Sequence, residues 1–234
     1  MVYFLISSLE SSEKAQAGFF INTLIVRIIY SSLNIRQIYA ILYPGADISE
    51  YNRDERMHGT PWFHATNIPN APPTNLVQIG VGGWTQPRDW YSTSRERRTT
   101  ILTMEDVDRY GIDWVAEYAL DIAWKQAKCV FLSFDIDCLD PAFAPGTGTP
   151  EPGGFLPREV FKLLQLVARE GLAGMEVVEV SPPYDVADVT ALLASRVIMD
   201  VLGTLVLNRK LGRVPPREES PPVEEKMDRQ EADG

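Results

Sequence analysis

Three carboxylates follow directly after an apolar stretch of the chain. The segment FLSFDIDCLD, Phe131 to Asp140, starts as a hydrophobic run and then carries Asp135, Asp137 and Asp140. Because side chains alternate between the two faces of a strand, Asp135 and Asp137 are predicted to share one face. Two carboxylates this close repel each other unless one keeps its proton or a cation lies between them. The pattern therefore indicates either a site for a divalent cation or a pair of loop hydrogen-bond acceptors.

Four short apolar runs are predicted to be the strands that position these acids. They are rich in Val, Ile and Phe, as buried parallel strands are, and they cover Ile38 to Tyr43, Asn75 to Val81, Cys129 to Asp137 and Gly174 to Val180. Since ligands of such sheets bind beyond the carboxyl ends of the strands, Glu179 is predicted to lie at the same edge as Asp135 and Asp137.

Helical segments separate the later strands. Ile112 to Lys128 has an apolar face, Pro157 is placed to begin a helix that Gly171 ends, and Asp188 is predicted to cap a helix that runs to about Leu202. Strands and helices that alternate in this order predict an α/β fold with a parallel sheet covered on both faces.

Composition narrows the partners and the compartment. The chain has 234 residues and a net charge of -10, of which the acidic tail contributes -4. No basic patch is present to neutralise phosphates, so nucleic acid is not an expected partner, whereas a cationic substrate fits the charge. The apolar run Phe19 to Tyr30 is shorter than the ~20 residues of a membrane span. Cys129 and Cys138 are predicted to be reduced thiols, which favours the cytoplasm.

The segment SFDIDCLDPAFAPGTGTPEPGG, Ser133 to Gly154, resembles the second metal-binding signature of the ureohydrolases, the arginase and agmatinase family. The likeness extends from about Asp47 to about Leu211. Within the family, the stretches Asp54 to Asn67, Asn75 to Arg88 and Glu176 to Thr190 are most similar to the branch that hydrolyses free guanidine, and agmatinases are a close second.

The resemblance implies a three-layer α/β/α sandwich with a mainly parallel sheet, here without its N-terminal strands. It also implies two divalent metal ions, Mn in most members and Ni in the guanidine branch, bridged by a hydroxide that attacks the guanidinium carbon and releases urea. The expected substrate is a small cationic guanidino compound, and the expected assembly is a homo-oligomer, a trimer or hexamer. Residues 1–40 are expected to be an atypical segment, 41–211 the metal-binding domain and 212–234 a disordered acidic tail.

The resemblance also assigns roles to individual residues. Asp135 matches the ligand that bridges both metals, Asp137 and Asp47 match further metal ligands, and Glu179 matches the carboxylate that binds the substrate guanidinium. His58 matches the histidine that shuttles a proton to the leaving amine, and a surface-loop histidine is its structural alternative.

Five other side chains receive local interpretations. His64 is expected to be structural, and Asp140 is expected to cap the Asp-Pro turn. Trp62, Phe63 and Trp84 could wall a cationic pocket or pack in the core.

The chain departs from the family pattern ahead of Asp47. Tyr43 and Gly45 stand where an aspartate and a metal-binding histidine belong, and no histidine precedes His58, so three of the six expected ligands remain. Met1 to Ala40 resembles no family segment, which suggests a truncated or mis-spliced gene product. The alternative function is therefore a catalytically impaired relative that acts as a subunit or binding module.

Overall fold

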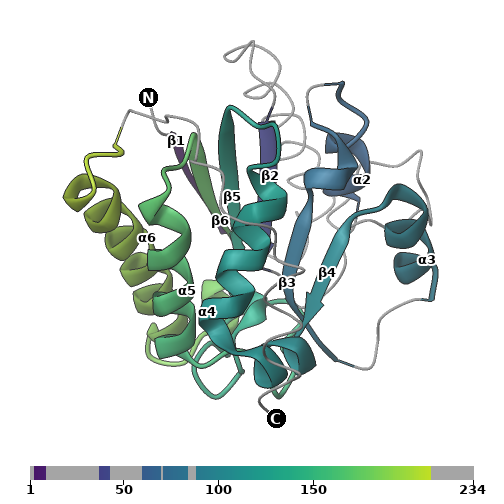
Figure 1. Cartoon of the computed structure of the whole chain (residues 1–234). Coiled ribbons are helices and arrows are strands. Elements are labelled where there is room, and N and C mark those ends of the chain that lie inside the picture. The colour runs from purple at the N-terminus through teal and green to yellow at the C-terminus, as the bar shows by residue number, and fades with distance from the viewer. Residues whose placement is uncertain (1–2, 9–36, 43–59, 70, 84–87, 212–234) are drawn as a thin grey trace.

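The computed structural model describes residues 3–8, 37–42, 60–69, 71–83 and 88–211. Six parallel strands form one sheet in the order β1-β6-β5-β2-β3-β4 (Figure 1). The strands are β1 (Tyr3–Ser8), β2 (Gln37–Leu42), β3 (Val77–Val81), β4 (Thr100–Thr103), β5 (Cys129–Asp135) and β6 (Gly174–Val180).

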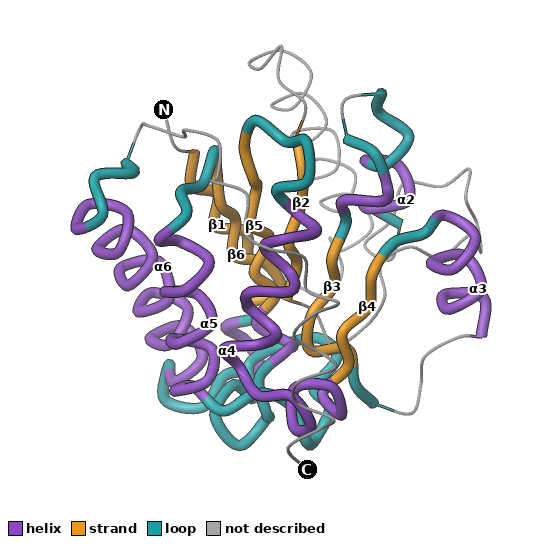
Figure 2. Tube along the Cα trace, viewed as in Figure 1, coloured by secondary structure: helices purple, strands orange, loops and turns teal. Residues whose placement is uncertain are grey.

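Three long helices lie side by side on one face of this sheet, as Figure 2 shows in purple against the orange strands. They are α4 (Met104–Ala123), α5 (Pro157–Arg169) and α6 (Val189–Leu207). Two shorter helices, α2 (Pro61–Ala65) and α3 (Arg88–Arg97), lie beyond the β3–β4 side of the sheet (Figure 1). The predicted α/β fold with a parallel sheet is confirmed.

The core lies between the sheet and the three long helices. In β5, Val130, Leu132 and Phe134 belong to this core, and each is almost fully buried. Burying an aliphatic or aromatic side chain of this size contributes about 1.5–3 kcal/mol, so these alternate positions fix which face of β5 meets the helices. Ser133 and Asp135 consequently project from the other face.

Local signals explain where the helices begin. Thr103 forms a capping box with Asp106 at the start of α4, and Gly111, with a φ of 80°, kinks this helix after its first two turns. The sequence predicted only the part after Gly111. Pro157 occupies the first turn of α5, and Gly171 follows its last residue, so both predicted boundaries of α5 are confirmed.

The direction of the connections reverses between β5 and β2, so this position is the switch point of the sheet. From β2 the chain moves through β3 to β4 at one side of the sheet, whereas from β5 it moves to β6 in the opposite direction. Connections that diverge from neighbouring strands leave an opening at their carboxyl ends, which is where open α/β sheets bind ligands. Asp135, the last residue of β5, lies at this point.

Helix α6 is apolar enough to pass a length and composition test for a membrane span, with a mean hydropathy of 1.7. Its side chains Ala194, Val197, Val201 and Leu205 recur at helical spacing and are buried in the core described above. The helix also packs against α5 and β6. One side of α6 is therefore packed in the core, whereas Leu192, Met199 and Leu207 of the same helix are exposed.

The cap of α6 differs from the predicted one. Asp188 stands at the N-cap position, but it has a φ of 59° and its side chain makes no capping hydrogen bond. Asp185 caps the helix instead, because its carboxylate accepts hydrogen bonds from the backbone N–H groups of Thr190 (3.1 Å) and Ala191 (3.0 Å). Burial raises the pKa of Asp185, but these hydrogen bonds outweigh burial and hold the pKa below its usual value.

Replacing Asp185 with Ala should lower the free energy of unfolding by about 1 kcal/mol, because α6 loses both capping acceptors. Asp188→Asn is the matched control, since it removes the charge of a neighbouring side chain that makes no cap and keeps a residue that tolerates a positive φ, and it should be almost neutral. Urea unfolding followed by circular dichroism gives both values. Equal losses for the two variants would contradict the assignment of the cap to Asp185.

Candidate metal and substrate site

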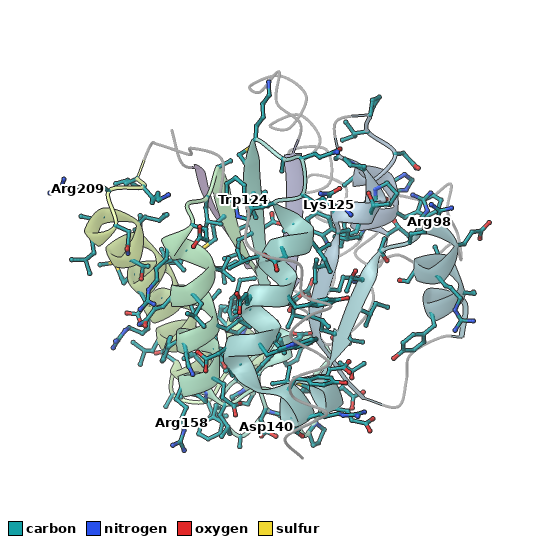
Figure 3. All side chains as sticks on the ribbon, viewed as in Figure 1. Arg98, Trp124, Lys125, Asp140, Arg158 and Arg209 are labelled. Carbon is teal, nitrogen blue, oxygen red and sulfur yellow. The ribbon has the colours of Figure 1, made fainter. Side chains whose placement is uncertain are left out.

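The carboxyl ends of all six strands lie at one edge of the molecule. In Figure 3, Arg98, Trp124 and Lys125, which precede β4 and β5, are labelled at the opposite edge from Asp140 and Arg158. The acids of the sequence motif therefore belong to the edge at which parallel sheets bind ligands.

Asp135 and Asp137 are brought together by a tight turn. The strand ends at Asp135, and Ile136–Cys138 form a 3₁₀ turn, so the prediction that both acids alternate along one strand face is wrong. A carboxylate oxygen of Asp135 instead accepts a hydrogen bond from the backbone N–H of Asp137 (2.8 Å). The two side chains are only 2% and 1% exposed. Such burial of neighbouring acids favours a bound cation.

Thr149, in the loop between β5 and α5, donates hydrogen bonds to Asp137. Its backbone N–H donates to Asp137 Oδ2 (3.1 Å), and its hydroxyl makes a short hydrogen bond to the same oxygen. The sequence analysis did not single out Thr149, although the Thr-Gly-Thr-Pro stretch that contains it was part of the resemblance. Two donors on one oxygen fix the orientation of the carboxylate and leave its other oxygen to face elsewhere.

The same loop is fastened to the end of β6. The hydroxyl of Thr147 donates to the carbonyl oxygen of Glu179 (3.0 Å), and the N–H of Ser181 donates to the carbonyl of Gly146 (2.8 Å). A Cβ atom at Gly146 would lie 2.6 Å from Cβ of Asp185, so only glycine allows this approach. The loop thus couples Asp137 to Glu179.

Glu179 lies at a bulge in β6. Two residues of β6, Val178 and Glu179, stand opposite the single residue Ser7 between the paired positions of β1. Glu179 has a φ of 64°, an unfavourable conformation for a side chain of this kind, and it is half-buried. Bulges re-aim side chains, and backbone strain of this type concentrates at functional positions. The sequence placed Glu179 at the strand end but could not show the bulge.

Asp140 organises the loop that follows the two acids. Its carboxylate oxygens accept hydrogen bonds from the N–H groups of Ala142 (2.9 Å) and Gly153 (2.9 Å). Cys138 and Phe155 are tied together by a backbone hydrogen bond of 2.9 Å. The predicted structural role of Asp140 is therefore confirmed.

The remaining predicted residues divide into two groups. Asp47, His58 and Trp84 lie outside the described residues. Trp62, Phe63 and His64 belong to α2, and Phe63 stacks under the guanidinium of Arg97 at 4.0 Å. Arg97 is the last residue of α3 and β4 begins at Thr100, so this cluster lies at the amino edge of the sheet. The ring of Phe63 therefore contacts the guanidinium of Arg97. Core packing, one of the two alternatives for Trp62 and Phe63, is confirmed.

The described residues have ligand atoms of the type that a divalent cation prefers, but there are too few of them to enclose one. Asp135 and Asp137 supply the oxygen ligands that Mg²⁺ and Mn²⁺ prefer. Within the ranges that the structure describes, no group of three or more His, Cys, Asp or Glu side chains gathers to hold a metal ion. Cys138 lies directly beside the pair, and burial, with the charges of Asp135 and Asp137, raises the pKa of its thiol well above the usual value.

These features define an α/β protein with a buried pair of acids at the carboxyl edge of its sheet. The family model described as the Arginase family matches residues 46–203, which include this site. The chain belongs to the arginase family, and the resemblance to the ureohydrolases is confirmed.

Individual relatives agree with this assignment. The chain is 39% identical over 145 residues to agmatinase from Proteus mirabilis and 37% identical over 145 residues to proclavaminate amidinohydrolase from Streptomyces clavuligerus. Each alignment covers 62% of this chain but only 44% and 46% of those relatives, so the match spans less than half of their length.

Solved structures confirm the arginase-like α/β fold. The structure of proclavaminate amidino hydrolase from Streptomyces clavuligerus superposes with a TM-score of 0.71 and 28% identity, covering 91% of this chain and 65% of that one. Formimidoylglutamase from Bacillus subtilis has a TM-score of 0.76 over 88% of this chain and 61% of that one, but at 21% identity it supports the fold alone.

A third buried acid lies in the sheet below the site. Glu176 of β6 pairs in register with Ser133 of β5, whose hydroxyl donates to one oxygen of the Glu176 carboxyl group (2.8 Å). The second oxygen is buried and has no hydrogen-bond partner in the described part of the chain. Burial raises the pKa of Glu176 to about 7, and the Ser133 hydrogen bond offsets only part of this effect.

Glu176→Gln should stabilise the fold at alkaline pH. Because the pKa of Glu176 rises from 4.5 to about 7 on folding, the wild-type chain loses stability as the pH increases between these values, and the loss is complete above them. The variant avoids a cost of about 3 kcal/mol above the folded pKa and gains little below pH 4.5.

Urea unfolding at several pH values measures this difference. Glu170→Gln, directly after the last residue of α5, removes a glutamate that lies outside the sheet and serves as the control for general loss of charge. A difference between Glu176→Gln and wild type that does not change with pH would contradict the prediction.

Proposed function

We propose that this chain carries the chemistry of a guanidino hydrolase, which cleaves a guanidino C–N bond and releases urea. The observation that carries the proposal is the buried pair Asp135 and Asp137 at the switch point of the sheet, within the segment that the family model matches. Guanidinium is resonance-stabilised and a poor electrophile, so its hydrolysis at neutral pH needs an activated water. Divalent ions lower the pKa of bound water from 15.7 to roughly 7 in favourable sites.

Asp47, Asp135 and Asp137 are the residues of this chain that would hold such ions, Mn or Ni. The two described acids are already oriented. Thr149 donates two hydrogen bonds to Asp137, and the N–H of Asp137 donates one to Asp135. A preorganised ligand loses little conformational entropy when a cation binds. Asp47 would complete a set of three carboxylates.

Glu179 is proposed to bind the substrate guanidinium. A carboxylate accepts two parallel N–H hydrogen bonds from this planar cation, and the bulge in β6 gives Glu179 a direction that a regular strand would not. Hydrogen bonds of this kind orient the guanidinium carbon. His58 is proposed to pass a proton to the leaving amine, because an imidazole titrates close to neutral pH.

The particular substrate belongs to a set of small guanidino cations. The sequence favours free guanidine, with agmatine second, and curated relatives include agmatinases and a guanidinopropionase from Pseudomonas aeruginosa. A closed pocket walled by Trp62 and Phe63 would suit the small guanidine cation, but these side chains lie at the amino edge of the sheet. The support for agmatine as the substrate therefore increases relative to the support for guanidine.

A second candidate function follows from the number of ligands. The described residues bring together two potential metal ligands, and the sequence has Tyr43 and Gly45 where the family has an aspartate and a histidine. A catalytically impaired relative, acting as a subunit or binding module on the same scaffold, fits this deficit. In either case we propose a homo-oligomer in the cytoplasm, without a nucleic acid or membrane partner.

The metal content of the purified chain separates these functions. After dialysis against Mn²⁺ or Ni²⁺ and removal of free metal, a hydrolase should retain about two ions per chain, as a dinuclear site requires. Asp135→Asn should reduce the retained metal at least tenfold, because it removes one charge from between the cations. Asp113→Asn, which removes an exposed carboxylate that pairs with Lys162, is the control and should leave it unchanged.

Urea release from guanidine, agmatine, guanidinobutyrate and arginine then tests the reaction itself. Release that requires metal and disappears in Asp135→Asn supports the hydrolase. We expect little or no turnover of the four compounds, because Gly45 stands where the resemblance expects a metal-binding histidine. A chain that retains no metal and releases no urea fits only the impaired relative.

A further inference from the structure

Helix α6 has an apolar face on its outer side. It is the outermost of the three long helices, next to α5 (Figure 1). Leu192, Met199 and Val206 are 66%, 64% and 56% exposed. Each follows the previous one by seven residues, so the three side chains form one row along the helix. A row with this repeat on the outside of a helix is typical of a surface that packs against another helix.

This outer face carries little charge. Arg196 and Asp200 are the only charged residues between Val189 and Leu207, and they form an ion pair with each other along the helix. The guanidinium of Arg196 also lies over the ring of Phe161 in α5, at 5.3 Å. A helix face that remains in water usually carries several charged residues, whereas this one has the composition of a face that becomes buried.

The order of residues on this face is symmetric about Met199. Leu192 and Val206 lie seven residues before and after it, and Ser195 and Gly203, the smallest exposed residues of the helix, lie four before and after it. Two antiparallel copies of α6 that cross at Met199 would thus place Leu192 against Val206 and Ser195 against Gly203. Small residues allow close approach, and a Cβ atom at Gly203 would meet nothing of its own chain within 4 Å.

The charges at the two ends of α6 favour the antiparallel direction. Asp188 is the N-cap residue, and Arg209 and Lys210 directly follow the C-cap residue Asn208. In an antiparallel pair, Asp188 of each copy lies near the basic end of the other, whereas a parallel pair would bring like charges together. Opposite charges across an interface stabilise its orientation and disfavour the alternative.

We propose that the outer face of α6 is the interface between two copies of this chain, which pair antiparallel about a two-fold axis at Met199. A two-fold interface uses the same surface of both copies, so it requires a self-complementary row of this kind. A membrane surface fits less well, because helices that bind membranes carry Lys and Arg beside the apolar face, and the net charge of the chain is -10. The proposal gives the homo-oligomer a defined interface and does not depend on the hydrolase chemistry.

Met199→Asp tests the centre of this interface, because it places two carboxylates against each other on the axis. Wild type should sediment at equilibrium as an assembly with an even number of chains, and the variant should halve the mass of that assembly. Tyr91→Asp, which replaces an exposed aromatic residue of α3, is the control and should leave the mass unchanged. Thermal unfolding shows whether both variants are folded.

Single cysteines report the direction of pairing. The chain has two cysteines of its own, and both are buried, so an added surface thiol is the one that reacts. Under mild oxidation, Met199→Cys should form a covalent dimer by itself. Leu192→Cys and Val206→Cys should not do so alone, but an equal mixture of the two should, because antiparallel pairing brings these positions together.

Three results would overturn the proposal. The first is a wild type that is monomeric at every concentration, or a Met199→Asp variant whose assembly keeps the wild-type mass. The second is a covalent dimer of Leu192→Cys alone, which indicates parallel pairing. The third is monomeric wild type that binds phosphatidylglycerol vesicles through Met199, which assigns the face to a membrane. A chain that retains no metal and releases no urea would refute the hydrolase and leave this interface unaffected.

Discussion

The site depends on the electrostatic cost of burying Asp135 and Asp137 next to each other. Two carboxylates with almost no exposed surface repel in a medium that screens poorly, so the fold must stabilise them locally. It does so with oriented N–H and O–H donors, one from the turn itself and two from Thr149. These donors explain why the strand stops at Asp135, because the 3₁₀ turn is what directs the N–H of Asp137 to its neighbour.

The loop between β5 and α5 transmits this constraint to the rest of the edge. It binds Asp137 through Thr149, the end of β6 through Thr147 and the start of α6 through Gly146, whose N–H donates to the Thr190 hydroxyl (2.8 Å). Asp140 closes the loop on itself. Three elements that are distant in sequence are therefore positioned by one segment, and a shift in any of them changes the relation of Glu179 to the two aspartates.

The sequence predicted those features that depend on local composition. Val and Ile runs identified β2, β3, β5 and β6, and Pro157 with Gly171 bounded α5, since both signals act within a few residues. It missed β4, which has only 4 residues, and it missed β1, although the sequence Tyr3–Ser8 begins with an apolar run. It assigned the α6 cap to Asp188 because the left-handed backbone there has no sequence signature. The turn at Ile136 could not be predicted from the sequence either, because Asp-Ile-Asp is compatible with a strand as well as with a turn. Thr149 is visible as a site residue only in the structure, where its loop folds back on the end of β5.

Several features of this edge lower stability and have no role in packing. Glu179 holds a positive φ, two acids are buried side by side, and Glu176 places a third carboxyl group in the sheet with one oxygen lacking a described partner. Apolar residues at these positions would give a more stable fold. Costs of this type, concentrated at the carboxyl edge beside the switch point and met by specific donors, are typical of a binding or catalytic site. In the sequence, Tyr43 and Gly45 stand where the resemblance expects an aspartate and a histidine. The acids contributed by β5 and β6 are thus arranged for ligand binding, and the residues that complete the set determine whether the site works.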